Sequence, residues 1–220
     1  MNYLQLVNDF LLESSLGDTV GSITTDSFEG RKSALWIKDA WVEIQRARLW
    51  KFRWAEGSFL TTVDKSNYTL ADLTLTEGVS LINTEFYVTG ASGIKTKLVP
   101  SFYTVIKSKK RVSEAAGLPR YISEKPNGEI ELYPKPSGEY TVDYEYYKAP
   151  VVLAIAADVP AFPSEYHKAI TWKALENYAR EEGGEWKGLY QTAIRNYNAV
   201  YRQLINTQLP SVTKGGAPFA

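Results

Sequence analysis

Apolar residues near the start of the chain recur every three or four positions, which is the spacing of one face of a helix. They are Leu4, Val7, Phe10 and Leu11 in a first segment, and Ile37, Ala40, Trp41, Ile44 and Ala47 in a second. The pattern predicts helices over residues 3–15 and about 27–50. Asn2 is the expected N-cap of the first helix, and Asp26 with Glu29 forms a predicted capping box for the second.

From Ser58 to about Lys148 the pattern changes to the alternation that is typical of half-buried strands. The candidate strands are residues 58–63, 68–70, 79–82, 85–89, 96–99, 102–107, 120–124, 129–133 and 140–147. Asn127-Gly128 between two of them predicts a hairpin, because this pair tolerates positive φ at both turn positions. Many short strands in succession predict a small antiparallel sandwich or barrel.

Two further helices follow an apolar, proline-broken connector at residues 149–160. Pro163 suits the first turn of a helix, where its missing N–H leaves no bond unmade. Gly183-Gly184 is expected to end that helix. A fourth helix is predicted over about residues 185–208, where tyrosines and aliphatic residues again share one face.

These elements predict an α+β fold in which both ends of the chain build one helical bundle. Residues 1–55 and 160–208 form the helical domain, and residues 56–159 form an inserted antiparallel β-sandwich or barrel domain with its connector. Residues 209–220 contain little that packs by itself, so we expect a flexible C-terminal tail.

Amino-acid composition limits the kinds of binding partner and the cellular compartment that we expect for this protein. The 25 Lys and Arg residues balance 25 Asp and Glu residues, so net charge provides no general attraction to nucleic acid or to an acidic membrane. The absence of cysteine excludes disulfides, thiolate metal sites and cysteine nucleophiles, and fits a reducing cytoplasm. Neither a signal peptide nor an apolar run of roughly 20 residues is visible, so we expect a soluble intracellular product.

A search for catalytic residues finds only weak candidates. The single histidine, His167, lacks a serine or carboxylate at motif spacing, which favours a partly buried helix histidine. Gly90-Ala-Ser-Gly93 lacks the lysine and the helix of a phosphate loop. Glu181, Glu182 and Glu185 lie beside a glycine turn, where acidic residues are usually solvated surface. The sequence therefore predicts no catalytic residue, no metal site, no cofactor and no enzyme.

Two segments are candidates for binding partners. The basic run contains Lys107, Lys109, Lys110 and Arg111, and it would face a phosphate backbone or an acidic partner, or form the solvated tip of a β-hairpin. Leu209, Val212 and Phe219 are the apolar candidates in the tail. The rings in Trp50–Trp54 could stack on bases, but at a helix-to-strand junction they more simply join the cores of the two domains.

Taken together, the chain resembles the head-to-tail adaptor proteins of short-tailed phages, which form the ring beneath the portal. The resemblance is spread over nearly the whole length, and none of its fragments is a catalytic motif. The fragments are Leu6–Leu12, Trp36–Gln45, Gly117–Tyr121, Gly128–Pro136, Tyr140–Tyr147 and Pro160–Ala179.

The resemblance implies a structural protein of the virion neck or tail that is made in the host cytoplasm. It implies a ring, typically of twelve copies, that contacts the portal protein above and nozzle or fibre proteins below, with no membrane partner. Genomic DNA would pass through the lumen without sequence-specific recognition. In related adaptors a C-terminal extension reaches the portal, so residues 209–220 are expected to do the same.

Two alternative functions remain open from the residues alone. His167 and the Glu181–Glu185 cluster are the candidates of a tail-associated cell-wall hydrolase. The Lys107–Arg111 run is the candidate of a DNA-binding accessory protein, although the balanced net charge argues against it.

Overall fold

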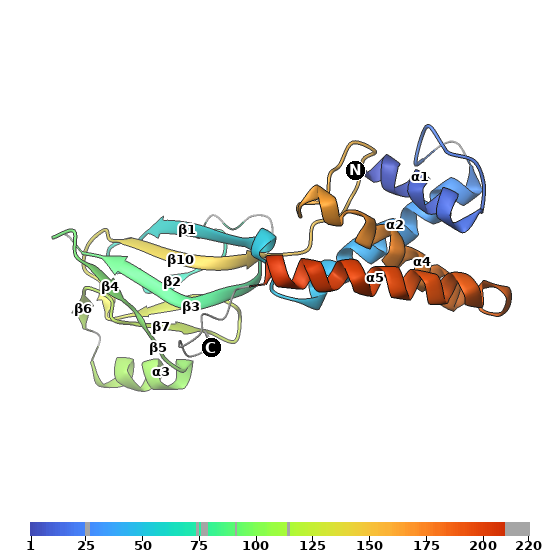
Figure 1. The fold of residues 1–220 in the computed structure, drawn as a ribbon. Helices are drawn as coiled ribbons and strands as arrows, with labels where there is room; N and C mark the ends of the chain where they lie inside the picture. The colour runs from blue at the N-terminus through green and yellow to red at the C-terminus, as the bar shows by residue number, and fades with distance from the viewer. Residues whose placement is uncertain (25–26, 74, 76–78, 91, 114, 210–220) are drawn as a thin grey trace. The chain divides into compact units, whose positions relative to one another are not determined.

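The computed structural model describes residues 1–24, 27–73, 75, 79–90, 92–113 and 115–209 of the 220-residue chain, with residues 79–84 described by their backbone alone (Figure 1). These residues divide into two compact units. The helical unit comprises Met1–Arg53 and the chain after Ala149, and the β unit comprises Trp54–Ala149. The helices and mostly antiparallel sheets confirm the predicted α+β class. Residues 150–159, which we expected to close the inserted domain as a connector, belong instead to the helical unit.

Helices from both ends of the chain pack around one core in the helical unit. The long helices described there are α1 (Tyr3–Ser14), α2 (Phe28–Ala47), α4 (Lys168–Glu182) and α5 (Lys187–Gln208). Short 3-10 turns precede or follow them at η1 (Lys51–Arg53), η2 (Ser164–Tyr166) and η3 (Gly184–Trp186). Helix α4 contacts α1, α2 and α5, so the C-terminal half of the chain completes the core that the N-terminal helices begin.

Local capping explains where these helices begin and end. The Asn2 side chain accepts a hydrogen bond from the Gln5 amide at 2.9 Å, and the Gln5 side chain accepts one from the Asn2 amide at 2.8 Å. This capping box confirms Asn2 as the N-cap of α1. Ser27 caps α2 by accepting from the Gly30 amide at 2.8 Å, whereas the predicted Asp26 lies outside the described residues. Gly183 has a φ of 66°, which ends α4 as expected.

The β unit contains two four-stranded sheets. In the first sheet the strand order is β1 (Trp54–Leu60), β10 (Thr141–Lys148), β3 (Val79–Thr89) and β4 (Lys95–Lys97). In the second sheet it is β2 (Asn67–Tyr68), β8 (Ile130–Tyr133), β7 (Tyr121–Glu124) and β5 (Val99–Pro100). The first sheet is antiparallel throughout, whereas β5 runs parallel to β7 in the second. A further parallel pair joins β6 (Ala116–Gly117) to β9 (Lys135–Pro136).

The two sheets enclose a shared apolar core, and no closed barrel forms in the described part of the chain. The first sheet supplies Phe59, Phe86, Val88, Val142 and Tyr144, and the second supplies Tyr68, Ile122, Ile130 and Leu132. Along β10, buried and less buried residues alternate, which confirms the pattern predicted for Thr141–Tyr147. Strands β7 and β8 do not alternate in this way, since they also bury Ser123 and Glu131. Gly128, at φ 80°, sits in the predicted Asn-Gly hairpin turn between β7 and β8.

Two predictions of local structure in the β region were wrong. Residues 102–107 were expected to be a strand, but Tyr103–Val112 form helix α3. In this segment only Ile106 is buried among the helical residues, so a single anchor, and not an alternating face, holds it to the sheet. The two strands predicted at residues 79–82 and 85–89 are one long strand, β3.

The aromatic residues of the helix-to-strand segment Trp50–Trp54 belong to different units. The Trp50 ring is fully buried in the helical core, stacks on Phe52 at 6.0 Å between centroids and donates its indole N–H to the Ile44 carbonyl at 2.6 Å. Trp54 lies at the start of β1, where its indole N–H donates to Glu145 at 3.2 Å. These rings therefore have structural partners within their own units.

Candidate functional site

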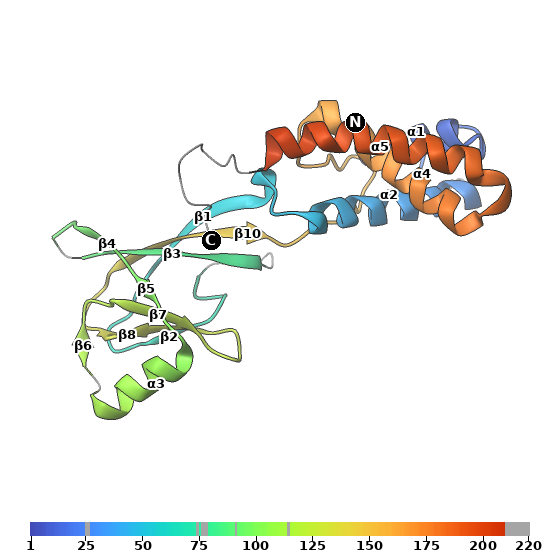
Figure 2. The ribbon, with the colours of Figure 1, turned by 60° about the horizontal axis from the view of Figure 1, so that its bottom comes forward.

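The predicted basic run lies on helix α3 (Figure 2). It was expected either to bind a partner or to form a hairpin tip, and the hairpin tip is wrong because these residues are helical. Lys109, Lys110 and Arg111 occupy the last turn, where positive side chains favour the negative end of the helix dipole. Helical periodicity then sends neighbouring cations in different directions, so the run is not one continuous basic surface.

Lys110 is directed toward the second sheet. Its ammonium group forms an ion pair with Glu131 and donates a hydrogen bond to the Ser66 hydroxyl at 2.9 Å. Glu131 is only 3% exposed, so the ion pair with Lys110 compensates the negative charge of a buried carboxylate. Lys110 therefore holds α3 on the sheet, and its predicted role in partner binding is not supported by its position.

The other cations of the run remain on the surface of α3. Lys107 lies 5.8 Å from the Tyr103 ring centroid, and Lys109 lies 4.7 Å from that of Tyr121. Such cation–π contacts hold the lysine chains along the surface without neutralising their charge. Lys107 and Arg111 are both exposed. These two side chains are available to an acidic partner.

Helix α3 also exposes apolar side chains beside these cations. Phe102 is 83% exposed and Val112 is 89% exposed, at the two ends of the helix, and Val105 is partly exposed between them. Exposed aromatic and arginine side chains are enriched at protein-binding surfaces. The sequence did not identify these apolar positions, because the segment was expected to be a strand and their exposure follows from the helix.

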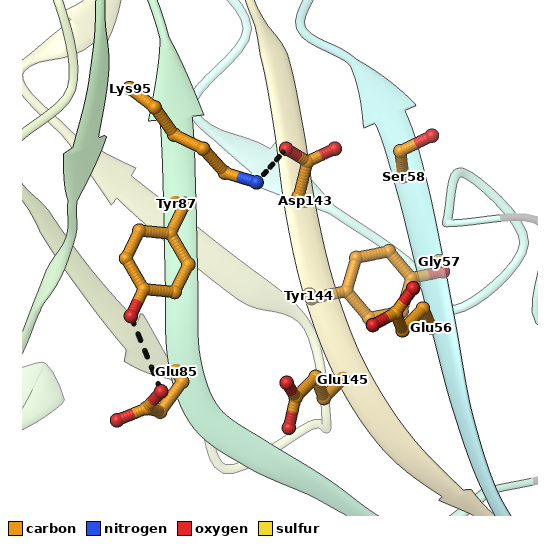
Figure 3. Close-up of a pocket in the computed structure, with 9 residues that line it drawn as sticks. All are labelled: Glu56, Gly57, Ser58, Glu85, Tyr87, Lys95, Asp143, Tyr144 and Glu145. Atoms are coloured by element: carbon orange, nitrogen blue, oxygen red, sulfur yellow. Dashed lines mark hydrogen bonds and ion pairs between the residues drawn. The ribbon is translucent and has the colours of Figure 1, made fainter.

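A groove lies on the outer face of the first sheet (Figure 3). It has a volume of about 400 Å³ and is lined by Glu56, Gly57, Ser58, Glu85, Tyr87, Lys95, Asp143, Tyr144 and Glu145. We call it the sheet groove. Its residues come from β1, β10 and β3 and from Lys95 at the start of β4, and the alternation that buries their neighbours places the acidic side chains outward.

Two lysines partly neutralise the sheet groove. Lys95 pairs with Asp143 at 2.8 Å, and Lys97 pairs with Glu85 at 2.5 Å. The hydrogen bond to Asp143 raises the pKa of Lys95, and the hydrogen bond from Lys97 lowers the pKa of Glu85. The Tyr87 hydroxyl also donates to Glu85 at 3.3 Å (Figure 3). Glu56 and Glu145 lie directly opposite each other in the β1–β10 register, and Glu145 accepts a hydrogen bond from the Trp54 indole N–H at 3.2 Å.

The helical unit has its own apolar groove at the start of α2. It has a volume of about 190 Å³, and its apolar lining is Phe10, Leu16, Phe28, Trp36 and Tyr178. Lys32 at its rim pairs with Glu182 at 2.7 Å. Leu12, Phe28 and Leu35 expose apolar side chains in this unit. This surface was not predicted, since the apolar stripe predicted for α2 begins at Ile37 and includes neither Phe28 nor Leu35.

His167 is buried, with both ring nitrogens engaged. Nδ1 lies 2.7 Å from the Met1 amino group, and Nε2 lies 2.9 Å from the Phe162 carbonyl oxygen. Desolvation lowers its pKa, which favours a neutral ring that accepts from Met1 and donates to Phe162. The histidine is more deeply buried than the partly buried position expected for it. Its geometry is that of a structural link between the chain start and α4.

The remaining candidates lie near the C-terminus. Leu209 follows the last residue of α5, donates its backbone N–H to the Ile205 carbonyl at 3.1 Å and packs partly buried against the helical core. Val212 and Phe219 lie outside the described residues. Of the predicted acidic cluster, Glu182 pairs with Lys32, while Glu181 and Glu185 are exposed.

The described ranges contain no cluster of three or more histidine and carboxylate side chains arranged to hold a metal ion. Over the same ranges, every helix falls short of the length and apolarity that crossing a bilayer requires.

Comparison with known proteins identifies the family to which the chain belongs. No curated protein matches the chain. A solved structure described as the neck of an empty GTA particle computed with C6 symmetry contains a chain that is 18% identical, with 85% of this chain and 87% of that chain covered and a TM-score of 0.27. At that TM-score the likeness says nothing of fold or role. A family model described as SU10 adaptor protein matches residues 1–211. This match covers both units and confirms the resemblance to adaptor proteins, and the chain therefore belongs to the SU10 adaptor protein family.

Proposed function

We infer that this protein is a head-to-tail adaptor of a short-tailed phage. In this role it assembles as a ring on the portal protein, joins the portal to nozzle or fibre proteins of the tail, and forms part of the channel through which DNA leaves the head. It acts in the neck of the virion. The observation that carries the proposal is the adaptor family match over residues 1–211, which includes the β unit and the helices on both sides of it in the sequence.

The chemistry of the surface supports a role in assembly. The candidate surfaces are the exposed apolar and cationic side chains of α3, the sheet groove and the apolar groove of the helical unit, and each can contact another protein. Different surfaces on one protomer make heterologous contacts, which close into rings when the rotation between copies permits. A balanced net charge also suits a DNA channel, because dense positive charge would hold phosphate and slow transit.

The hydrolase alternative has little support in the geometry of its candidate residues. A general base needs a nitrogen that can take a proton from substrate or water, and both nitrogens of His167 are already engaged in the interior. Glu182 is held by Lys32. The DNA-binding alternative is weakened because Lys110, one of its four candidate cations, forms an ion pair with Glu131.

The test of the proposed function is assembly on portal rings. Purified protein is mixed with portal rings of the same phage, and the mass of the complex and its electron-microscopic projections are measured. We expect added mass equal to a closed ring of copies and a new layer of density on one end of the portal. Portal particles of unchanged mass and outline would contradict the proposal.

A further inference from the structure

Three polar side chains form a row across the second sheet, on the face that α3 covers. Asn67 on β2 and Ser123 on β7 are each direct partners of Glu131 on β8, which lies between them. Direct partners on one face of a sheet have Cβ atoms about 5 Å apart, so the three polar groups are neighbours in space. The residues next to them along these strands point to the opposite face, into the apolar core, and are Tyr68, Ile122, Ile130 and Leu132.

Helix α3 covers this row of side chains. Figures 1 and 2 both show α3 beyond the second sheet, on the side away from the first sheet. Lys110, on the same side of the helix as the buried Ile106, binds Glu131 and the Ser66 hydroxyl. Lys109 lies over the Tyr121 ring of β7. The polar row is therefore enclosed between the helix and the sheet.

Each member of the row has a buried polar atom without a hydrogen-bond partner among the described residues. These atoms are Asn67 Oδ1, Glu131 Oε2 and Ser123 Oγ. The burial is deep, since Glu131 is 3% exposed and Ser123 is 5% exposed. Nearly all buried polar atoms in folded proteins are bonded to protein or to ordered water, because an unbonded one is costly. Three such atoms in adjacent positions indicate one shared ligand.

The charge of the site favours a neutral ligand. Lys110 binds the other carboxylate oxygen of Glu131, Oε1, and so balances the negative charge of this residue. A metal cation bound at Oε2 would lie beside the Lys110 ammonium group, and like charges at this separation repel. The ligand therefore needs hydrogen-bonding groups and no charge of its own.

The hydrogen-bonding requirements of the row match one water molecule. Glu131 Oε2 and Asn67 Oδ1 only accept hydrogen bonds, whereas the Ser123 hydroxyl can donate one. A water molecule has two hydrogens for the two acceptors and a lone pair for the hydroxyl. Three hydrogen bonds are typical of a buried water in a protein, and such waters bind where buried polar groups lack a protein partner.

We propose that a water molecule binds between α3 and the second sheet, where it donates to Asn67 Oδ1 and Glu131 Oε2 and accepts from the Ser123 hydroxyl. The water links the side chains of β2, β8 and β7, and Glu131 extends this link to Lys110 of α3. The site concerns the anchoring of α3 within one copy, so it stands independently of the proposed function.

A crystal structure of the full chain, at a resolution that shows ordered water, tests the site directly. We expect a density peak about 2.5–3.0 Å from each of the three atoms. A peak coordinated by six or more oxygen atoms would be a metal cation and would overturn the proposal. The absence of a peak would overturn it as well, whether or not the three side chains had turned to bond one another directly.

Ser123→Ala tests the site in solution through the sign of its effect on the melting temperature, measured by scanning calorimetry. If the hydroxyl donates to the water, its removal breaks a buried hydrogen bond, and the melting temperature should fall by about 4 °C or more. A hydroxyl that bonds nothing would be an uncompensated buried polar group. Its removal would leave the melting temperature unchanged or raise it, and that result would contradict the proposal.

Ser108→Ala is the matched control for this measurement. Ser108 is an exposed serine on α3 whose hydroxyl donates to the Thr104 carbonyl of the same helix at 2.9 Å. Its replacement removes the same atom from the same unit without touching the row, so the melting temperature should stay within about 2 °C of the parent protein. An equal fall for both alanine variants would show that the effect of Ser123→Ala does not come from the buried site.

Discussion

The ring of Tyr144 occupies the space above Gly57, its direct partner across the β1–β10 pair. A Cβ atom at Gly57 would lie 2.5 Å from both Cζ and the hydroxyl oxygen of Tyr144, which is too close for any side chain. The Tyr144 hydroxyl meanwhile donates to the Leu73 carbonyl at 2.5 Å inside the β core. The glycine therefore allows a large buried ring to cross the sheet and reach a backbone acceptor.

Gly57→Ala should consequently destabilise the β unit. The new methyl group displaces the Tyr144 ring, which disturbs the packing of the core and its buried hydrogen bond. We expect a loss of about 2 kcal/mol in the free energy of unfolding, measured by urea denaturation followed by tyrosine and tryptophan fluorescence.

Gly117→Ala is the matched control, since no atom lies within 4 Å of a Cβ built at that glycine of the same unit. Its unfolding free energy should stay within about 0.5 kcal/mol of the parent protein. Equal stabilities of the two alanine variants would contradict the role assigned to Gly57.

The ion pair between Lys110 and Glu131 supports a second prediction. Lys110→Met removes the partner of a buried carboxylate, so the free energy of unfolding should fall by about 2 kcal/mol. This loss is smaller than for a fully buried ion pair, because the lysine is partly exposed to solvent. Lys107→Met, on the exposed side of the same helix, is the control and should have little effect. A Lys110→Met Glu131→Leu double variant should recover most of the loss, measured by the same denaturation, and failure to recover would show that the pair is not the cause.

Helix α3 illustrates where reasoning from sequence stops. Helix caps at Asn2, the glycine stop at Gly183 and the Asn-Gly hairpin depend on local geometry, so their patterns were sufficient to predict them. Helix α3 buries only Ile106 among its own residues, and whether the segment forms a strand or a helix depends on where Ile106 finds a buried site on the second sheet. That information lies in distant strands and not in the segment.

The candidate surfaces show the same limit. The Lys107–Arg111 run was found from its composition, but which lysine faces Glu131 and which faces solvent follows only from the helix phase. The sheet groove was missed because Glu56, Glu85 and Glu145 are far apart in sequence and are brought together by strand pairing. Spacing along the chain cannot reveal such a cluster.

The position of His167 predicts a dependence of stability on pH. Burial and the nearby Met1 amino group lower its pKa in the folded state below its ordinary value of about 6.5. A histidine with a lowered folded pKa stabilises fully above the unfolded pKa, and this contribution is lost as pH falls below about 6.5 toward the folded pKa. The free energy of unfolding should therefore decline between about pH 6.5 and 5, by at most about 1.4 kcal/mol per pH unit.

His167→Gln is the variant that isolates this effect. Its amide can still donate to the Phe162 carbonyl and accept from the Met1 amino group, but it does not titrate. Denaturation at a series of pH values should show a flatter profile for the variant over the same interval. Parallel profiles for the two proteins would assign the pH dependence to other groups.

The C-terminal segment supports the last prediction. Leu209 packs partly buried against the helical core just after the end of α5, so a chain that stops after Leu209 keeps all the described helices of that unit. Removal of residues 210–220 should therefore leave the circular dichroism spectrum and the unfolding temperature nearly unchanged. It should weaken docking to portal rings by at least about tenfold, because the resemblance to adaptor proteins implies a portal contact for the tail, and loss of contact area lowers affinity. Docking is measured as portal-bound mass across a dilution series, with Leu209→Ala in the full-length chain as the comparison that perturbs the helix end and keeps the tail. Equal docking by the shortened and full-length proteins would show that the portal is bound by the folded units alone.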